Sequence, residues 1–265
     1  MGKNLTLTHK ITLAAMLLAF NVVSTRLLGM AQAFPLFAFN RLSLATSLTM
    51  FSSILLGPLF GAIVGVGGDA IGWLIMGQWT GPFNIYISMY YALIGIIPYF
   101  IVRYFGKALD SDKSICPLFL IIALMAVAFI VLLWVLPGFT TRFEQLGIEE
   151  LPCKIIFTAI ICILSLAIIL FLFYFQRKKN LQGLGSIYWT CLLVEGLTIV
   201  LKPVCFWLYC LTFLGTDLVG GFGVPFELLV LISLLFAFPD ILINIFFLRL
   251  CFWVYGRALG SNRHE

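Results

Sequence analysis

Eight long apolar stretches cover most of this chain. They are residues 11–29, 42–57, 58–77, 84–105, 115–136, 155–175, 187–213 and 226–254. Hydrophobic residues make up 62% of the composition, charged residues only 10%, and the mean hydropathy is +1.12. A water-soluble fold cannot bury that much apolar surface, whereas about 20 apolar residues at ~1.5 Å each cross a bilayer as a helix. The runs are too long for barrel strands and do not alternate, so we expect an all-α, polytopic membrane bundle.

The basic residues predict the topology of this bundle. One side of the alternating segments receives Lys3, Lys10, Arg103, Lys107, Lys113, Arg177, Lys178, Lys179, Arg249, Arg257 and Arg263. The other side receives Arg142 and Lys154 together with Glu144, Glu149, Glu150 and Asp217. The positive-inside rule therefore predicts about eight crossings with the N- and C-termini in the cytoplasm. The net charge of +5 sits at helix ends rather than in a patch, so we expect no nucleic acid partner.

The third apolar stretch carries glycines at helical spacing. Gly57, Gly61 and Gly65 recur every four residues, as do Gly68 and Gly72. This spacing places small residues on one helix face and lets a second backbone approach closely. We expect these glycines to pack helices of this chain together. The Gly57-Pro58 pair, which alone separates two apolar runs, is expected to form a turn.

Ionisable residues within the apolar runs are candidates for structural or functional roles. Asp69 lies in the third stretch, and the last two stretches contain Glu195, Lys202, Asp240 and Asn244. A charge at membrane depth is costly and faces a polar interior or a partner. For Asp69 a structural pairing and a functional role stay open. Glu195 and Lys202 lie two helical turns apart and cannot pair directly, so a structural salt-bridge network with other helices is the expected use.

Two short loops on the predicted outer side combine aromatic, amide and hydroxyl side chains. Their candidate ligand contacts are Phe37, Asn40, Arg41, Gln78, Trp79, Thr80 and Asn84. Aromatic rings stack on a flat ligand, amides bond its edge, and an arginine pairs with an anionic group. The alternative is an interfacial aromatic belt with a snorkelling arginine.

Several motifs are missing from the sequence. It contains no G-x-x-x-x-G-K-[ST] loop, no H-E-x-x-H and no G-x-S-x-G, so nothing in it favours an ATPase or another enzyme. The seven cysteines form no C-x-x-C pair, and the two histidines lie near the termini. We therefore expect no metal and no cofactor.

Within residues 11–105, three elements follow one another: ITLAAMLLAFNVV with Ala15-x-x-x-Ala19, then FNRLSLATSLTMFSSILLGPLFGAIVGVGGDAIGWLI, then GPFNIYISMYYALIGIIPYFI. In this order they resemble the substrate-binding S component of an energy-coupling factor (ECF) vitamin transporter. The closest similarity is to the folate-type subgroup. The G-P-x-x-G and G-G-D-x-x-G elements carry most of the resemblance, because an alanine pair is common in membrane helices.

This resemblance implies a specific function. An S component binds a vitamin or related micronutrient from outside and associates with a membrane coupling subunit and two cytoplasmic ATPases. Ala15 and Ala19 would contact the coupling subunit, and the ligand would lie under the outer loops. The chain would then be a single transmembrane domain, residues 1–265, in the plasma membrane of a prokaryote.

The chain departs from this family in length. S components have six helices, and the sequence predicts about eight. We expect the surplus to be a helical hairpin at about 112–184, inserted between the fourth and fifth helices of the core. The rival functions are a proton-coupled secondary carrier and a membrane-embedded lipid or isoprenoid enzyme, for which Asp69, Glu195 and Asp240 would be the candidate residues.

Overall fold

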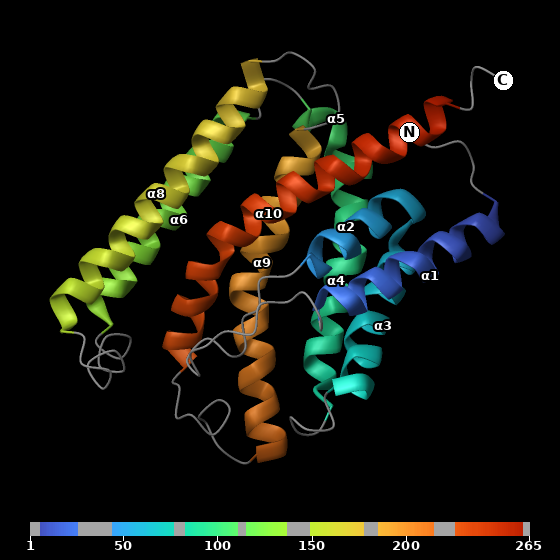
Figure 1. Cartoon of the computed structure of the whole chain (residues 1–265). Helices are drawn as coiled ribbons and strands as arrows, with labels where there is room; N and C mark the ends of the chain where they lie inside the picture. Colours follow the sequence, from blue (N-terminus) through green and yellow to red (C-terminus); the bar gives the residue numbers. More distant parts are fainter. Residues whose placement is uncertain are drawn as a thin grey trace.

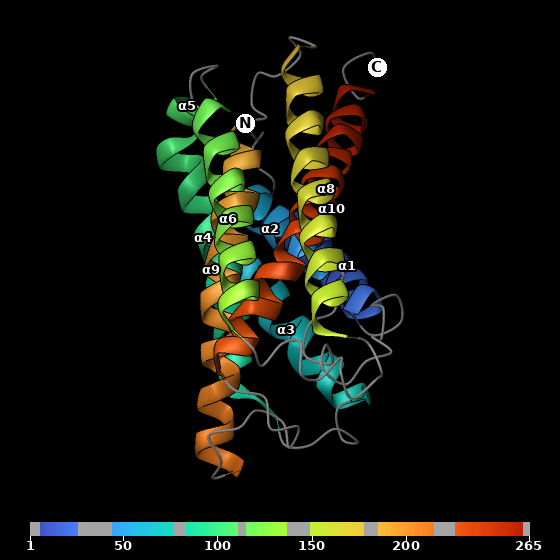
Figure 2. The ribbon, with the colours of Figure 1, turned by 90° about the vertical axis from the view of Figure 1, so that its left-hand side faces the viewer.

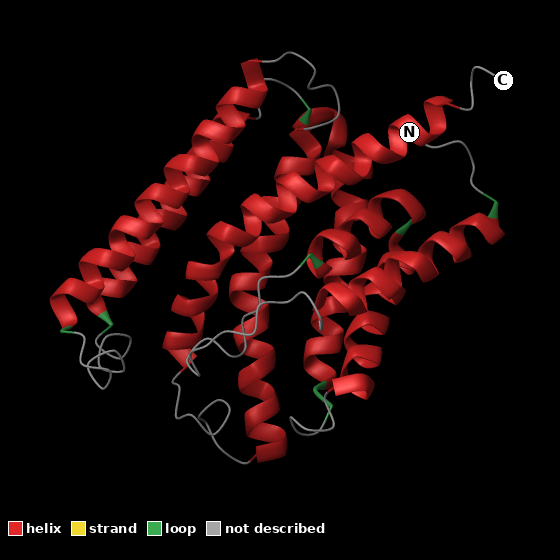
Figure 3. Cartoon of the chain, in the orientation of Figure 1, coloured by secondary structure: helices red, strands yellow, loops and turns green. Residues whose placement is uncertain are grey.

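The computed structural model describes residues 6–25, 44–76, 83–110, 115–136, 149–177, 185–214 and 226–261. Within these ranges it contains helices and no strand (Figure 3). The principal helices are α1 (Leu7–Val23), α2 (Ala45–Leu56), α3 (Pro58–Met76), α4 (Ile85–Phe100), α6 (Ile115–Val135), α8 (Glu150–Arg177), α9 (Gly185–Tyr209) and α10 (Phe226–Ser261). Short helices η4 (Ile101–Phe105) and α5 (Gly106–Leu109) continue α4, and η7 (Cys210–Leu214) continues α9. The expectation of a polytopic helical bundle is confirmed.

The helices alternate between two sides of the molecule (Figure 1). In this view α8 ends and α9 begins at the top, and α1 begins and α10 ends at the upper right. The end of α6 and the start of α8 lie at the lower left, and α9 ends at the bottom. The positive-inside rule assigns the upper side to the cytoplasm, because Arg103 and Lys107 lie on that side, after α4.

Six helices are long and apolar enough to cross a membrane, and α1 and α2 are shorter. The 12 residues of α2 extend only about 18 Å, against a hydrocarbon thickness of ~30 Å. Six of the described helices are therefore long enough for a full crossing, and α1 and α2 are shorter than the eight expected crossings require. At the other extreme, α10 has 36 residues with Pro239 inside it. It changes direction along its length (Figure 1), as a proline that removes a backbone hydrogen bond allows.

A sharp turn separates α2 from α3. Gly57 has φ 111°, a left-handed conformation that glycine adopts without strain, and α3 begins at the next residue, Pro58. A single continuous helix is excluded here. The predicted turn is confirmed.

The glycine face of α3 packs against α4 and α1. A Cβ atom at Gly61 would lie 2.1 Å from the Gly95 carbonyl oxygen of α4. One at Gly65 would lie 2.6 Å from the Tyr91 carbonyl oxygen, and one at Gly68 would lie 2.8 Å from Cγ of Asn21 in α1. The predicted use of these glycines in packing within the chain is confirmed for these three positions.

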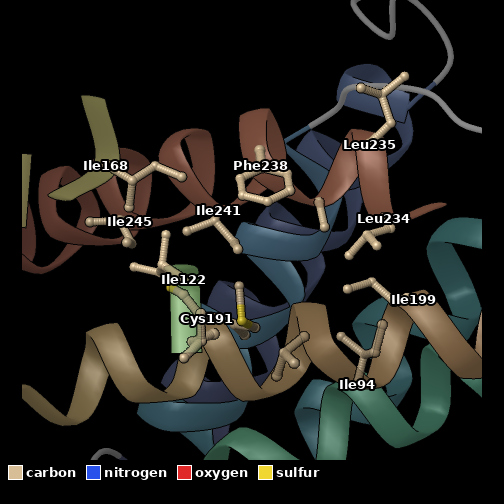
Figure 4. Close-up of a cluster of buried hydrophobic side chains, with 14 of the residues drawn as sticks. Ile94, Ile122, Ile168, Cys191, Ile199, Leu234, Leu235, Phe238, Ile241 and Ile245 are labelled. Carbon is tan, nitrogen blue, oxygen red and sulfur yellow. The ribbon is translucent and has the colours of Figure 1, made fainter. Parts of the chain in front are cut away.

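The core of the bundle lies between α4, α9 and α10 (Figure 4). Phe238 and Ile241 of α10 and Cys191 of α9 are fully or almost fully buried there. Large apolar side chains such as Leu59, Leu93 and Phe246 are exposed instead. In a membrane protein, such outward apolar surface faces lipid.

Helices α6 and α8 form a hairpin at one edge of the molecule (Figures 1 and 2). Each has one buried stripe, with Leu118, Ile122 and Phe129 on α6 and Ile161 and Ile168 on α8. Near the lower end of the hairpin, the Trp134 indole donates to the Thr158 hydroxyl at 3.4 Å. The two helices contact each other and also α10, so the hairpin is attached along one side.

Candidate substrate site and intramembrane polar cluster

Most residues of the candidate ligand site lie outside the described part of the chain. These are Phe37, Asn40, Arg41, Gln78, Trp79 and Thr80. Asn84 alone among the candidate contacts is described. The structure does show how the helix ends on either side of both outer loops are held.

The ends of the first outer loop are tied together. The Leu44 backbone N–H at the start of α2 donates to the Ser24 hydroxyl after α1, at 3.0 Å. Ser24 is buried. The end of α1 is therefore held directly against the start of α2.

Asn21, one helical turn before Ser24, joins three helices. Its Nδ2 donates to the Thr49 hydroxyl of α2 at 3.1 Å and to the Val64 carbonyl oxygen of α3 at 3.3 Å. Its Oδ1 accepts from the Thr25 hydroxyl at 3.1 Å. A buried amide with these partners fixes α1, α2 and α3 relative to one another. Sequence reasoning missed this role, although an asparagine inside an apolar helix was the signal.

The second outer loop is bracketed by aromatic and polar contacts. Trp73 near the end of α3 packs edge-on against Phe83, with ring centroids 5.4 Å apart. The Asn84 side-chain oxygen accepts from the Ile87 backbone N–H at 3.2 Å and caps α4. Asn84 thus has a local structural use, which an asparagine directly before an apolar helix could have indicated.

Asp69 is used within the chain. Its Oδ2 accepts a hydrogen bond from the Ser88 hydroxyl of α4 at 2.6 Å. The contact lies between α3 and α4, in the halves of both helices nearest the second outer loop. The Asp69–Ser88 hydrogen bond therefore connects the end of α3 to the start of α4.

These contacts give the outer ends of α1 to α4 a fixed arrangement. Hydrogen bonds hold these helices together, and they are made by Ser24, Asn21 and Asp69. The Trp73–Phe83 ring contact adds to them. A binding loop gains affinity when its ends are already positioned, because less ordering entropy is lost on binding. The helix ends that precede and follow both loops are therefore fixed relative to one another.

A second polar cluster lies deep in the bundle. The Glu195 carboxylate of α9, 2% exposed, accepts from Asn244 Nδ2 of α10 at 2.6 Å. Asn244 Oδ1 in turn accepts from the Ser47 hydroxyl of α2. Lys202 and Asp240 lie close enough to act electrostatically on Glu195. Glu195 therefore has a partner on another helix through hydrogen bonds, with Ser47 as a member that sequence reasoning missed, and the expected salt bridges stay a prediction.

A further polar bond connects α4 to α9. The Tyr90 hydroxyl lies 2.9 Å from the Thr198 hydroxyl, and the Thr198 hydroxyl donates to the Val194 carbonyl oxygen at 2.9 Å. Tyr90 is 3% exposed. Helices α2, α4, α9 and α10 are thus joined by hydrogen bonds inside the membrane as well as by apolar packing.

Replacing Asn244 by leucine is expected to lower the free energy of unfolding by about 1–3 kcal/mol, because it removes the hydrogen bonds that Asn244 makes with the Glu195 carboxylate and the Ser47 hydroxyl. The measurement is a thermal melt of the detergent-solubilised protein. Phe246→Leu on the same helix is the matched control, since Phe246 is 61% exposed and should leave the melting temperature unchanged. Equal melting of the two variants would show that the bond to Glu195 contributes nothing.

The two alanines of the predicted coupling face lie on the outside of α1. Ala15 and Ala19 are exposed, whereas the neighbouring Ala14 is buried against the bundle. Exposed Ile11 and Met16 flank them on α1. What covers Ala15 and Ala19 in the membrane stays a prediction.

Comparison with protein families finds one described as "ECF-type riboflavin transporter, S component", which matches residues 5–178. The match covers well over half of the 265 residues. It runs from the start of α1 to the end of α8. Searches of curated proteins and of solved structures found no match to the chain.

Proposed function

Because the chain belongs to the family of ECF-type riboflavin transporter S components, we propose that it captures a flat, vitamin-like solute at the outer ends of α1 to α4. The chain is the substrate-binding S component of an ECF transporter, and this family is a transporter component, not a class of enzymes. Riboflavin is the first solute to test, since the family is described by it. The folate-type subgroup suggested by the sequence remains a second candidate ligand class.

The family match is the observation that carries this proposal. The fixed helix ends support it, because the two aromatic and amide-rich segments of the sequence are joined to them. The partners we propose are a membrane coupling subunit and two cytoplasmic ATPases, with the plasma membrane of a prokaryote as the location. A phosphate-binding loop is absent from the sequence, so energy from ATP has to come from other chains.

Uptake into vesicles is expected to require the coupling subunit, both ATPases and ATP. The chain alone should bind [³H]riboflavin and retain it near stoichiometrically, without accumulating it inside the vesicle. The two measurements are equilibrium binding to the purified chain and time-resolved uptake with and without the partners. Accumulation by the chain alone that collapses with a protonophore would instead establish the secondary carrier.

Arg41→Ala is expected to weaken binding by roughly ten- to over a hundredfold if Arg41 pairs with an anionic group of the ligand. Losing a charge-assisted hydrogen bond costs about 1.5–3 kcal/mol, and each 1.4 kcal/mol is a factor of ten in Kd. Trp79→Ala should also weaken binding if its ring stacks on the ligand. Calorimetric titration is run beside a melting curve. A well-folded Arg41→Ala protein with normal affinity would remove Arg41 from the site, and a loss of stability alone would assign it a structural pairing.

A further inference from the structure

We propose that the cytoplasmic end of α4 binds the headgroup of one anionic phospholipid, with the lipid phosphate held by Arg103 and Lys107. Both residues follow α4, in η4 and α5, on the side assigned to the cytoplasm (Figure 1). This end of α4 is opposite to the end that follows the second outer loop. Lipid binding here is therefore independent of which solute the chain captures.

The backbone of α4 changes just before these basic residues. Pro98 lies inside α4, and the π-helical turn η4 follows from Ile101. A proline removes a backbone hydrogen bond, and π-helical turns within helices are frequent at functional sites. The backbone N–H of Tyr99 donates to the buried Ser53 hydroxyl of α2 at 3.2 Å. A second helix therefore helps to hold Tyr99 in place.

The Arg103 side chain is held by Tyr99, one turn earlier. Its guanidinium donates to the Tyr99 hydroxyl, and its central carbon lies 5.4 Å from the centroid of the Tyr99 ring. A guanidinium has five N–H donors, so most of them remain available after this bond. A hydrogen bond and a cation–π contact to one ring restrain the guanidinium on the side of the helix. The remaining donors are thus presented at a defined place.

The positive charges of Arg103 and Lys107 are not neutralised within the described part of the chain. Both residues are exposed there, and neither forms an ion pair with a carboxylate. The acidic residue nearest to them along the chain is Asp110, whose Oδ1 accepts from the Ser186 backbone N–H of α9 at 2.8 Å. Two basic groups four residues apart are therefore available to one external anion.

Exposed apolar and aromatic side chains lie along α4 on the membrane side of these charges. Leu93, Phe100 and Tyr104 are 43%, 42% and 69% exposed. The Phe100 and Tyr104 rings are parallel, with an interplanar angle of 2° and centroids 5.9 Å apart. From Leu93 to Tyr104 the helix rises about 16 Å, close to half of the ~30 Å hydrocarbon thickness. An acyl chain of one leaflet can therefore lie against this face while its phosphate reaches Arg103.

Charge complementarity favours an anionic phospholipid as the occupant. The cytoplasmic leaflet carries anionic lipids, and each Lys or Arg near its surface strengthens the attraction to them. Phosphatidylcholine has the same phosphate but carries a compensating cation, and a soluble phosphate has no chain to cover Leu93 and Phe100. Basic residues at other cytoplasmic helix ends attract the leaflet in a diffuse way. Arg103 differs because Tyr99 fixes the position of its donors.

The test is native mass spectrometry of the purified full chain, delipidated in detergent and titrated with phosphatidylglycerol. The unchanged protein should retain one phosphatidylglycerol and bind it roughly tenfold more tightly than phosphatidylcholine. Arg103→Gln and Lys107→Gln should each weaken binding of phosphatidylglycerol by roughly fivefold. Lys10→Gln is the matched control, since it removes one positive charge near the start of α1 on the same side of the membrane, and it should leave the affinity unchanged.

A charge-conserving variant separates a defined site from general attraction. Arg103→Lys keeps the charge but loses the planar fork of donors, so it should also weaken binding of phosphatidylglycerol. A melting curve accompanies each variant, and Lys107→Gln decides the proposal if the Arg103 variants do not fold. Equal affinity for phosphatidylcholine, or equal losses in Lys10→Gln and Lys107→Gln, would overturn the site. Displacement of the lipid by millimolar glycerol 3-phosphate would assign the two basic groups to a soluble anion and would also overturn it.

Discussion

Gly61→Ala is expected to lower the melting temperature by roughly 2–12 °C, although it adds a single methyl group. The new Cβ atom would lie 2.1 Å from the Gly95 carbonyl oxygen and 2.7 Å from the Ser53 Cβ atom. The first of these is backbone, which cannot rotate away as a side chain can. Overpacking of this kind costs about 1–3 kcal/mol, or about 2–4 °C per kcal/mol for a chain of this size. Gly61→Leu should prevent recovery of a monodisperse protein.

Gly196→Ala is the matched control for this prediction. Gly196 also lies in an apolar helix, but a Cβ atom there would meet nothing within 4 Å. Alanine is a better helix former than glycine by up to about 1 kcal/mol, so this variant should melt at the same temperature or slightly higher. If both alanine variants melt like the unchanged protein, the close crossing of α3 and α4 is wrong.

The sequence predicted the features of the fold that depend on one segment at a time. The lengths of the apolar runs located the helices, and the loop charges agree with their alternation. Gly57-Pro58 marked the turn, because a glycine with positive φ and a proline at the first helical position are local requirements. The spacing of Gly61 and Gly65 identified a packing face before its partner helix was known.

Features that depend on two distant segments could not be predicted in the same way. Nothing near Glu195 in the sequence identifies Asn244 as its partner, since the pairing depends on how α9 and α10 are rotated against each other. The meeting of Asp110 with Ser186 likewise becomes visible only when the chain has folded. The short length of α2 was missed because the apolar run extends to Leu44 and Gly57, which are not helical.

For the candidate site, the sequence predicted which kinds of side chain the two loops contain, but not how these side chains are used. Two loops rich in aromatic and amide residues indicate a ligand or a membrane interface, and both uses draw on the same side chains. The structure adds the anchors at Ser24, Asp69 and Trp73, which position the ends of these loops. It also gives Asn84 a capping role, which a composition argument could not separate from ligand binding.

Replacing Ala15 and Ala19 together by tryptophan is expected to abolish association with the coupling subunit and to leave ligand affinity unchanged. Both residues are exposed on one face of α1, four positions apart, which places them on adjacent turns. Small residues at this spacing let a second helix approach closely, and two indole rings would hold it several ångströms away. The measurement is recovery of the coupling subunit with a tagged S component, beside [³H]riboflavin binding to the same preparation.

A second pair of tryptophans separates a specific interface from a general effect of large side chains in the membrane. Ala123 and Val127 of α6 are also exposed and four residues apart, on the hairpin at the opposite edge of the molecule from α1. Ala123→Trp with Val127→Trp adds similar bulk to a surface that faces lipid, so it should leave the complex intact. Equal loss of the coupling subunit from both double variants would remove Ala15 and Ala19 from the interface. Loss confined to the α1 variant would place the coupling subunit against α1, on the far side of the bundle from the hairpin.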